Sequence, residues 1–379
     1  MRIAFVHNMY IKYRLPLFQK LAKIFNITFF FDEIDSKTTV QNKDFNFKVL
    51  KSILILKTGL DHHTLSPTLF YHLVRGKYDF IIGTNIGHVG THIAFLVSRL
   101  THKPFILWDE VWYWPRTFLR ILIWPFVKFM LSQSNAIVVP GSKAKEFFVS
   151  LHVDPDKIFV APNASICVLD KSITVKKEEM EERLGIQDKK VVLYFGRLIR
   201  RKGLSYLIEA FSKLQEEISD SFLLIAGEGE IREELEKLLT HKMNNILFTG
   251  FINEKEKAFY YSIADIVVLP SIRAGHEVEV WGLVLNEAMS VGKPVIATTA
   301  VGAAYDLIEN GINGCIVNEG DVQSLYEALK EMLSDPRKLE EMGTESKKII
   351  EESFTYDHMT QGFVETIQHI TNSLNETKR

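Results

Sequence analysis

The chain has 379 residues, 46% of them hydrophobic and 24% charged, which suits two domains with full cores and excludes a disordered protein. Its net charge of −2 gives no reason to expect nucleic-acid binding by the chain as a whole. Its two cysteines, Cys167 and Cys315, are too far apart for a disulfide framework or a zinc motif. The apolar run at the N-terminus is too short for a signal peptide, and no stretch reaches the ~18 uncharged apolar residues of a membrane span, so we expect a cytoplasmic protein.

The charge is unevenly distributed along the chain. Residues 1–170 contain 20 Lys and Arg against 12 Asp and Glu, which leaves 25 against 35 for the remainder. A basic half beside an acidic half suggests that the basic half meets something anionic. Ordinary scatter, or attraction between the two halves, explains the same numbers.

The first half reads as alternating strands and helices. We expect a helix over residues 15–24 and a parallel, doubly wound sheet whose strands cover residues 3–6, 27–31, 79–83, 104–108 and 136–139. The first strand–helix loop has no glycine and is therefore not a dinucleotide-binding fingerprint. Glu110 follows the strand that ends at Trp108, where its carboxylate is either a contact for a sugar hydroxyl or simply solvated.

The least usual stretch of this half, WYWPRTFLRILIWPFVKFML, runs from Trp112 to Leu131. It is aromatic and apolar, with basic residues interleaved, and Pro125 should kink any helix there. One interpretation is a core helix. The other is a lipid-facing surface, because Trp and basic residues suit the headgroup level of a membrane.

The second half begins after a linker predicted at residues 162–177. A strand at 191–195 is followed by the glycine-flanked turn GRLIRRKG and by a helix from Gly203. Arg197 and Lys202 in that turn lie at the carboxyl end of the predicted sheet, where a guanidinium and an ammonium suit a diphosphate. A basic surface turn is the alternative.

A strand at 266–269, a loop, a helix over about 283–291 and a strand at 294–297 are predicted as a strand–loop–helix–strand unit. Ligands of parallel sheets bind beyond the carboxyl ends of the strands. The loop carries Glu277 and Glu279, and Glu287 lies on the following helix. Gly282 allows close approach of a ligand, and the helix that it opens has free N–H groups that favour a phosphate. Two acids flanking an anion site suit a nucleotide-sugar. A solvated acidic loop is the alternative.

These residues resemble the E-x7-E signature of retaining family-4 glycosyltransferases of the GT-B fold. The match runs from Glu279 through Trp281-Gly282 to Glu287, and the GR-x4-KG turn and a YR-x-PLF opening at Tyr13-Arg14 are also similar to members of the family. The segment 272–278 is longer than usual, but only Glu279 keeps the spacing to Glu287.

The resemblance implies an α/β protein with two Rossmann-like domains, their parallel sheets facing a central cleft. Residues 1–167 would bind the acceptor, residues 168–355 would bind the donor, and a helix in 356–379 would pack back onto the first domain. The catalytic residues would be Glu279, Arg197 and Lys202. The donor contacts would be Glu287, Gly282, Leu283, Val284, Gly250, Phe251 and Gly227, and the acceptor contacts Arg14 and Glu110.

The resemblance further implies a metal-independent hexosyltransferase without a cofactor, which moves a sugar from a nucleotide diphosphate sugar to a glycan or lipid-linked acceptor in cell-surface polysaccharide, lipopolysaccharide or glycolipid synthesis. No histidine, cysteine or carboxylate pattern has the spacing of a metal site. We expect the protein in the cytoplasm, with a possible place at the inner face of an anionic membrane. A nucleotide-sugar 2-epimerase and a non-catalytic scaffold of the same fold are the alternatives.

Overall fold

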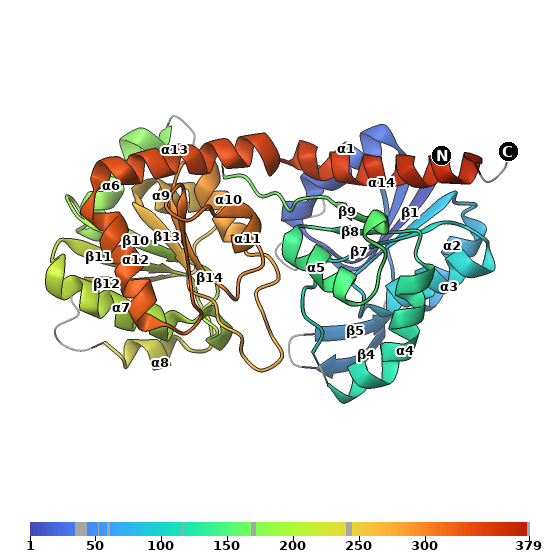
Figure 1. Ribbon diagram of the computed structural model, residues 1–379, viewed down its shortest axis with the longest axis horizontal. Helices are drawn as coiled ribbons and strands as arrows, with labels where there is room; N and C mark the ends of the chain where they lie inside the picture. The colour runs from blue at the N-terminus through green and yellow to red at the C-terminus, as the bar shows by residue number, and fades with distance from the viewer. Residues whose placement is uncertain are drawn as a thin grey trace. The chain divides into compact units, whose positions relative to one another are not determined.

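The computed structural model describes residues 1–34, 44–51, 53–58, 61–115, 117–167, 172–239 and 245–376. The chain divides into two compact units, one of Met1–Asn163 with Tyr356–Arg379 and the other of Ala164–Thr355. Each unit is built on a parallel sheet covered by helices (Figure 1). This confirms the α/β class and the two Rossmann-like units expected from the sequence.

The sheet of the first unit has the strand order β3-β2-β1-β6-β7-β8-β9, with every neighbouring pair parallel. A separate antiparallel pair, β4 and β5, was not predicted. The strands of this unit are β1 (Arg2–Tyr10), β2 (Asn26–Ile34), β3 (Asn46–Val49), β4 (Ile53–Thr58), β5 (Asp61–Leu65), β6 (Phe80–Thr84), β7 (Phe105–Trp108), β8 (Ala136–Val139) and β9 (Ile158–Val160).

The last helix of the chain, α14, belongs to the first unit. Gly362 makes this possible, because a Cβ there would lie 2.3 Å from the carbonyl oxygen of Val160. The next residue, Phe363, packs its ring against Phe5 and Trp108. The helices of this unit are η1 (Lys12–Arg14), α1 (Leu15–Ile24), α2 (Pro67–Arg75), α3 (Val89–Leu100), α4 (Phe118–Gln133), α5 (Ser142–Ser150), η2 (Pro155–Lys157) and α14 (Tyr356–Glu376).

The sheet of the second unit has the order β12-β11-β10-β13-β14-β15, again with parallel neighbours. The strand order reverses between β10 and β13, and a ligand site is expected beyond the carboxyl ends of strands at such a point. The strands are β10 (Lys190–Phe195), β11 (Ser221–Ala226), β12 (Ile246–Gly250), β13 (Ile266–Leu269), β14 (Val295–Thr298) and β15 (Gly314–Val317).

Both faces of this second sheet are covered. Val191 and Leu193 pack into one apolar cluster and Val192 and Tyr194 into another, as the period of two along a strand requires. The helices are α6 (Ser172–Leu184), η3 (Arg200–Lys202), α7 (Leu204–Glu217), α8 (Arg232–Glu236), α9 (Lys257–Ile263), α10 (Leu283–Ser290), α11 (Ala304–Leu307), α12 (Val322–Ser334) and α13 (Pro336–Ser353).

The region between the two units differs from the linker predicted at 162–177. Helix α6 already begins at Ser172, and residues 168–171 lie outside the described part of the chain. The division falls after Asn163 rather than after Cys167. The reason is hydrogen bonding: Ser165 donates to Glu287 at 2.9 Å, and the Cys167 N–H donates to Ser290 Oγ at 3.0 Å, both on α10.

The stretch 112–131 is partly core and partly exposed, which confirms the core helix for one face and leaves the lipid-facing interpretation a prediction. Val127, Met130 and Leu131 of α4 are buried in the core of the first unit. On the same helix Phe118 is 84% exposed and Leu122 66% exposed. Pro125 lies inside α4, and Arg116 lies outside the described residues.

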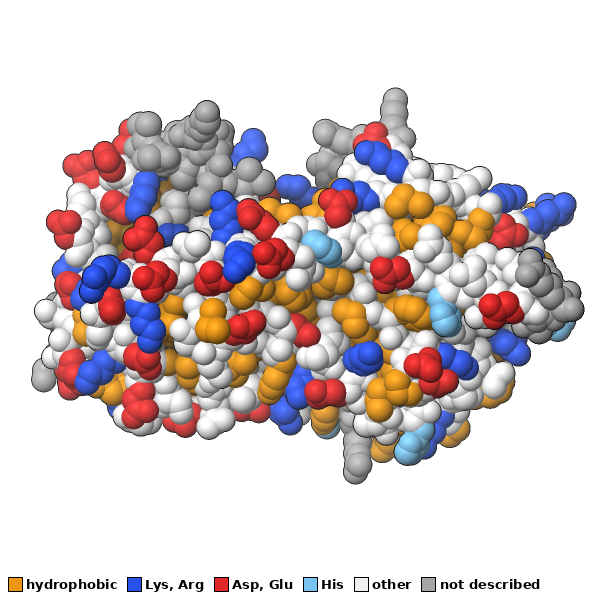
Figure 2. All heavy atoms as spheres, turned by 45° about the horizontal axis from the view of Figure 1, so that its top comes forward, with side chains coloured by type: hydrophobic (Ala, Val, Ile, Leu, Met, Phe, Trp, Pro, Cys, Tyr) orange, Lys and Arg blue, Asp and Glu red, His pale blue; other side chains and the backbone are white. Residues whose placement is uncertain are grey.

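The charged side chains on one face of the second unit are not separated by sign (Figure 2). On the face of the second unit that Figure 2 shows, acidic and basic side chains are intermixed rather than gathered by sign. The acidic surplus of the second half therefore forms no single patch on that face.

Over the described residues, every helix is too short or too polar to cross a membrane.

Candidate active site

Two loops meet where the strand order of the second sheet reverses. One follows β10 and ends at Gly203, and the other follows β13 and begins at Pro270. Gly203 has a φ of 65°, and a Cβ at that position would lie only 2.0 Å from the carbonyl oxygen of Pro270. Only glycine allows this approach. The contact brings the basic turn before Gly203 up to the acidic loop after Pro270.

At this contact Glu279 pairs with two cations. Its Oε2 lies 2.5 Å from Lys202 Nζ and 2.7 Å from Arg201 Nη1. All three side chains are largely buried, with exposed fractions of 11%, 9% and 14%. Burial by itself raises the pKa of Glu279, but Lys202 and Arg201 outweigh it, so the pKa lies below its usual value. Glu279 is therefore ionised at neutral pH.

Burial and the pairing with Glu279 also shift the pKa of Lys202, each with the sign opposite to its effect on Glu279. Burial lowers its pKa, Glu279 raises it, and the neighbouring Arg201 and Arg197 lower it again, with a net lowering. Lys202 and Arg201 contact Glu279, Arg201 also pairs with Glu277, and Arg197 acts on Lys202 from nearby, so three cations lie near two carboxylates. This surplus of positive charge favours a further anion.

Glu277 is the competing carboxylate in the loop. It lies 3.4 Å from Arg201 Nε, and 48% of its side chain is exposed. Ala274 and Glu277 exchange backbone hydrogen bonds of 3.0 and 3.1 Å, which close the longer segment 272–278 into a tight turn. The loop therefore brings Glu279, and not Glu277, to Lys202.

Helix α10 begins at this loop with its N–H groups unsatisfied by side chains. Its N-cap, Gly282, has a φ of 105°, and a Cβ there would lie 2.7 Å from Leu269 Cδ2. No side chain of the described residues caps the helix, and its first turn, with Leu283 and Val284, contains no acidic residue. The N–H groups of this turn are therefore available to an anionic group.

The loop is held in place on its other side. The Gly302 N–H donates to the carbonyl of Glu279, and the Ala303 N–H donates to that of Trp281, both at 3.0 Å. The indole N–H of Trp281 donates to Asn286 Oδ1 at 2.8 Å. Glu279 and the start of α10 are thus fixed before any ligand binds.

Glu287, on the second turn of α10, is buried and has three hydrogen-bond donors. Ser165 Oγ and Lys257 Nζ donate to Oε1 at 2.9 and 2.8 Å, and Tyr261 OH donates to Oε2 at 2.8 Å. Burial and the charge of Glu287 raise the pKa of Tyr261 well above its usual value. Burial lowers the pKa of Lys257, but the attraction of Glu287 outweighs it and the net shift is upward. The three donors accordingly fix the orientation of the carboxylate.

The other predicted donor contacts lie along the same edge of the sheet. Gly227 directly follows β11, and Gly250 is the last residue of β12. The Gly227 N–H donates to the Gly250 carbonyl at 2.9 Å. Phe251 is 57% exposed beside them. Arg197 is exposed in the loop after β10, and its charge acts on Lys202.

In the first unit the two predicted acceptor contacts are partners of one another. Arg14 Nη2 forms an ion pair with Glu110 Oε1, and Arg14 Nη1 donates to Asn163 Oδ1 at 2.7 Å. The Arg14 guanidinium also lies 5.0 and 4.8 Å from the ring centres of Tyr13 and Trp108. Only 3% of the Arg14 side chain is exposed, against 27% for Glu110. Glu110 therefore has the larger surface for a ligand.

Two groups of the first unit, His7 on β1 and Asp109 directly after β7, have shifted pKa values. Burial lowers the pKa of His7 to about 3, helped by the charge of Arg14. Burial raises the pKa of Asp109 to about 6, although the N–H groups of Val111 and Ile86 that donate to it oppose the shift.

Sequence reasoning missed four residues of the site. Arg201 stands in the recognised motif but was passed over in favour of Arg197 and Lys202. Ser165, Lys257 and Tyr261 carry no motif, and nothing local in the sequence connects them with Glu287. In the described part of the chain, no three His, Cys, Asp or Glu side chains are grouped as a metal ion requires.

Comparison with known proteins bears on this site. Residues 176–349 match the family model of glycosyl transferases group 1. An uncharacterized glycosyltransferase of Methanocaldococcus jannaschii is 31% identical over 239 residues, which are 60% of this chain and 58% of that protein. The GDP-mannose-dependent alpha-(1-6)-phosphatidylinositol monomannoside mannosyltransferase of Mycolicibacterium smegmatis is 33% identical over 171 residues, 44% of each chain. The chain thus spans about half the length of the curated relatives it matches.

Solved structures match over nearly the whole chain. HepE of Anabaena, crystallised in complex with UDP, superimposes with a TM-score of 0.77 at 19% identity, covering 97% of this chain and 100% of that one. The same protein has been solved with UDP-glucose. At this identity the likeness shows the fold, which is GT-B.

Proposed function

We propose that the protein transfers a sugar from a nucleotide diphosphate sugar to an acceptor hydroxyl. The match of residues 176–349 to the family model of glycosyl transferases group 1 and the GT-B fold support this proposal. The observation that carries this proposal is the pairing of Glu279 with Lys202 and Arg201 beside the uncapped start of α10. The cations and the helix start suit a diphosphate, and Glu279 suits the hydroxyls of the sugar next to it.

The chemistry of sugar transfer explains this arrangement. As the bond from the sugar to the diphosphate breaks, negative charge grows on the diphosphate and the sugar becomes oxocarbenium-like. Lys202, Arg197 and the N–H groups of Leu283 and Val284 would stabilise the growing charge from fixed positions. No metal ion is required for that role, and we propose that the reaction is metal-independent and retains the anomeric configuration.

Glu287 would bind the donor through its ribose hydroxyls. In the structure the Glu287 oxygens accept from Ser165, Lys257 and Tyr261, which hold the carboxylate in place. A carboxylate oxygen has more than one acceptor position, so hydroxyls can be added to these bonds. Gly250 and Phe251 would then contact the base through their backbone groups.

The acceptor would bind to the first unit at Glu110. Its carboxylate follows β7 and keeps more of its surface than its partner Arg14 does. We propose that Glu110 receives the hydrogen bond of the acceptor hydroxyl and that Arg14 positions it.

The acceptor is proposed to be lipid-linked, because α4 carries an exposed apolar face. This α4 face consists of Phe118, Ile121, Leu122 and Phe129. Two cations border it, with Arg120 5.0 Å from the ring centre of Trp114 and Lys128 5.5 Å from that of Trp124. Apolar and aromatic groups next to cations suit an anionic membrane surface, and such an acceptor fits glycolipid, lipopolysaccharide or surface-polysaccharide synthesis.

Donor binding tests the central proposal. UDP, GDP and ADP are titrated into the protein in excess chelator, by calorimetry or by the rise of the unfolding temperature. We expect saturable binding of at least one of them. Binding that appears only after magnesium or manganese is restored would contradict the metal-independent site.

The acceptor test distinguishes transfer from epimerisation. The protein is incubated with the nucleotide-sugar that binds, without and with a lipid-linked glycan. Transfer requires the acceptor, whereas release of an epimerised sugar nucleotide in its absence would support a 2-epimerase. Turnover of neither kind by a protein that binds the donor would support a scaffold.

The membrane proposal is tested by sedimentation with liposomes that contain or lack anionic lipid. We expect pelleting with anionic liposomes at low salt, and its loss in Leu122→Glu. The control is Ile312→Glu, which changes an exposed isoleucine of the second unit. If the wild-type protein stays in the supernatant, the α4 face does not bind membranes.

A further inference from the structure

A second polar pocket lies at the opposite edge of the second sheet from Glu279. It has a volume of about 810 Å³ and is lined by the residue before β13, by the turn before β14, and by α6 and α13. We call it the lysine pocket and define it by Lys177, Asp265, Lys293, Glu340 and Thr344. Because Asp265 and Lys293 precede their strands, the pocket lies at the amino edge of the sheet, away from the proposed donor site.

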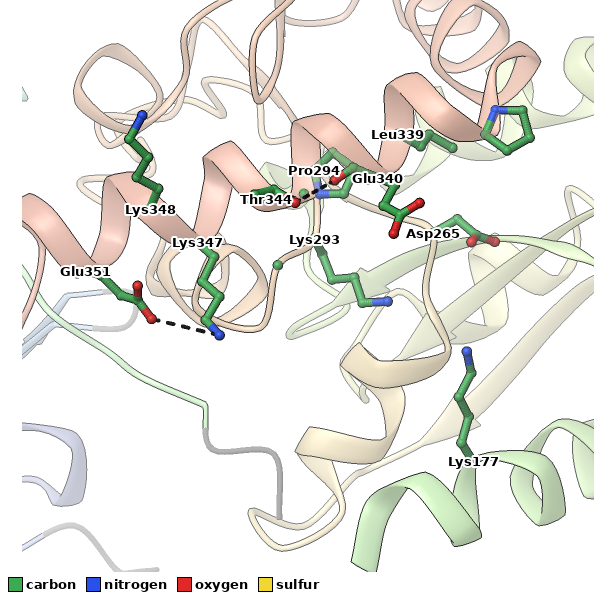
Figure 3. Close-up of a pocket in the computed structure, with 13 residues that line it drawn as sticks. Lys177, Asp265, Lys293, Pro294, Leu339, Glu340, Thr344, Lys347, Lys348 and Glu351 are labelled. Carbon is green, nitrogen blue, oxygen red and sulfur yellow. Dashed lines mark hydrogen bonds and ion pairs between the residues drawn. The ribbon is translucent and has the colours of Figure 1, made fainter. Parts of the chain in front are cut away.

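The floor of the lysine pocket is set by a pair of glycines. A Cβ at Gly343 of α13 would lie 2.2 Å from the carbonyl oxygen of Gly292, in the turn that leads to β14. The helix therefore packs directly on the turn. The next residue of that turn, Lys293, projects beside α13 (Figure 3).

Lys293 is mostly buried and incompletely satisfied by the protein. Its Nζ donates to the Ser262 carbonyl at 3.0 Å, whereas an ammonium has three N–H groups to donate. Burial lowers its pKa to about 8, an effect that Asp265 opposes and Lys177 reinforces. A further anionic partner would remove the electrostatic cost of this arrangement.

Lys177 supplies a second cation. Figure 3 shows the side chains of Lys177 and Lys293 pointing toward one another, and the charge of Lys177 acts on Lys293. Lys177 pairs with Glu181 at 3.6 Å, with 44% and 26% of the two side chains exposed, and the charge of Glu181 also acts on Lys293. A pair of this kind contributes little, so a phosphate between the two lysines would meet little competition.

The remaining groups of the pocket accept hydrogen bonds. Asp265 Oδ2 accepts from the Val191 N–H at 2.7 Å, which leaves its other oxygen for a ligand. Glu340 and Thr344 lie one turn apart on α13 and both line the pocket, and the Thr344 hydroxyl donates to the Glu340 backbone carbonyl at 3.1 Å, so it is left to accept from a ligand (Figure 3). Carboxylates and a hydroxyl beside two cations suit a ligand with both hydroxyls and a phosphate, and the volume is ample for a small sugar phosphate.

We propose that the lysine pocket binds a small hydroxylated phosphate monoester. The phosphate would lie between Lys177 and Lys293, and the hydroxyls would contact Asp265, Glu340 and Thr344. This site is separate from the donor site and does not depend on the proposed transfer reaction.

The test uses glucose 6-phosphate as the probe, with inorganic phosphate and glucose as comparison ligands. Calorimetric titration should give saturable binding of glucose 6-phosphate, weaker binding of inorganic phosphate, and none of glucose. Loss of one charged hydrogen-bond partner should weaken binding about 10- to 100-fold in Lys293→Met and in Lys177→Met. The control Lys338→Met removes an exposed lysine of the same helix, paired with Glu331, and should leave binding unchanged.

Chemical labelling locates the bound probe. Lys293 should react with a limiting amine reagent near pH 8, and glucose 6-phosphate should protect it, as judged by peptide mass spectrometry. Lys202→Ala, in the donor site, should leave this binding intact. If glucose 6-phosphate fails to bind, or both Lys→Met variants bind it as the wild type does, the proposal is wrong. The proposal is equally wrong if binding of glucose 6-phosphate disappears in Lys202→Ala. If inorganic phosphate binds as tightly as glucose 6-phosphate, the proposed contacts of the sugar hydroxyls are wrong.

Discussion

A buried ion pair lies at the carboxyl edge of each sheet, and the two pairs differ in what surrounds them. In the first unit one cation, Arg14, meets one carboxylate, Glu110, and the guanidinium is completed by Asn163 and two aromatic rings. In the second unit Glu279 meets two cations, and Arg197 adds a third charge nearby.

The difference indicates which of the two edges is prepared for an anion. The Arg14 pair is balanced in charge, so it offers no surplus charge to an anion, and only Glu110 keeps surface for the proposed acceptor hydroxyl. The Glu279 cluster has surplus positive charge beside an open helix start, which suits the anionic ligand proposed for it. A buried ion pair does not by itself identify a binding site, whereas an uncompensated surplus of charge points to one.

The largest effect should come from breaking the balanced pair. Arg14→Leu leaves the partly buried Glu110 without its cation, which should lower the stability of the first unit by about 3–5 kcal/mol. Denaturant unfolding measures this. The matched control is Lys20→Leu, which removes an exposed pair with Asp357 and should cost at most about 1 kcal/mol. Equal stability of the two variants would mean that the Arg14 pair is not structural.

The second prediction concerns the charge surplus of the other edge. Lys202→Ala and Arg197→Ala should each lower turnover about 10²- to 10³-fold, as removal of a fixed charge partner in the transition state does. The unfolding temperature should change less than in Arg14→Leu, since Arg201 still pairs with Glu279. Lys213→Ala, on the exposed side of α7, is the control. A near wild-type rate in either variant would remove that residue from catalysis.

The three glutamates sharpen the assignment within the donor site. Glu287→Gln should weaken donor binding about 10- to 100-fold, the effect of losing a charged hydrogen bond. Glu279→Gln should lower turnover more than it weakens binding of the nucleotide diphosphate alone, which lacks the sugar. Glu277→Gln is the control, because this residue is half exposed and contacts only Arg201 among the ion pairs of the described chain.

The outcome for Glu277 decides the register of the loop. If Glu277→Gln is damaging and Glu279→Gln is silent, the roles of the two residues are exchanged. If all three variants transfer sugar as the wild type does, the E-x7-E interpretation fails.

The smallest effect is a pH dependence of the first unit. The unfolded chain protonates His7 near its ordinary pKa of 6.5 but the folded chain only near 3, so stability is lost as the pH falls between these values. Asp109 acts in the opposite direction, because its folded pKa of about 6 exceeds its ordinary 3.8, and stability is gained as the pH falls through that window. The two contributions largely cancel between pH 6 and 4.

Removing one of the two groups should reveal the other. His7→Phe, which suits a site lined by Phe18, Phe31 and Trp108, should become more stable relative to wild type as the pH falls from 6 to 4. Unfolding midpoints of both proteins across this range provide the measurement. Parallel pH profiles would show that His7 does not titrate as its burial implies.

The sequence by itself determined the α/β class, most strands and helices, and which residues of the proposed donor site stand in local motifs. It could do so because alternating and helical periods, the glycine-flanked turn GRLIRRKG and the spacing of Glu279 from Glu287 are short-range features that a single stretch of chain displays. For the same reason Gly282 was recognisable as a position of close approach, whereas the contact of Gly203 with Pro270 was not predicted.

Only the tertiary structure decided which side chains meet. Arg201 reaches Glu279 because β10 and β13, distant in the chain, are neighbours at the reversal of strand order. Ser165 belongs to the second unit because it hydrogen-bonds to Glu287 on α10, so the domain boundary lies before it. Helix α4 has one face in the core and one exposed. Arg14 and Glu110 were predicted as separate contacts and are one pair. These contacts depend on the order of strands and the packing of helices, which no local pattern of residues specifies.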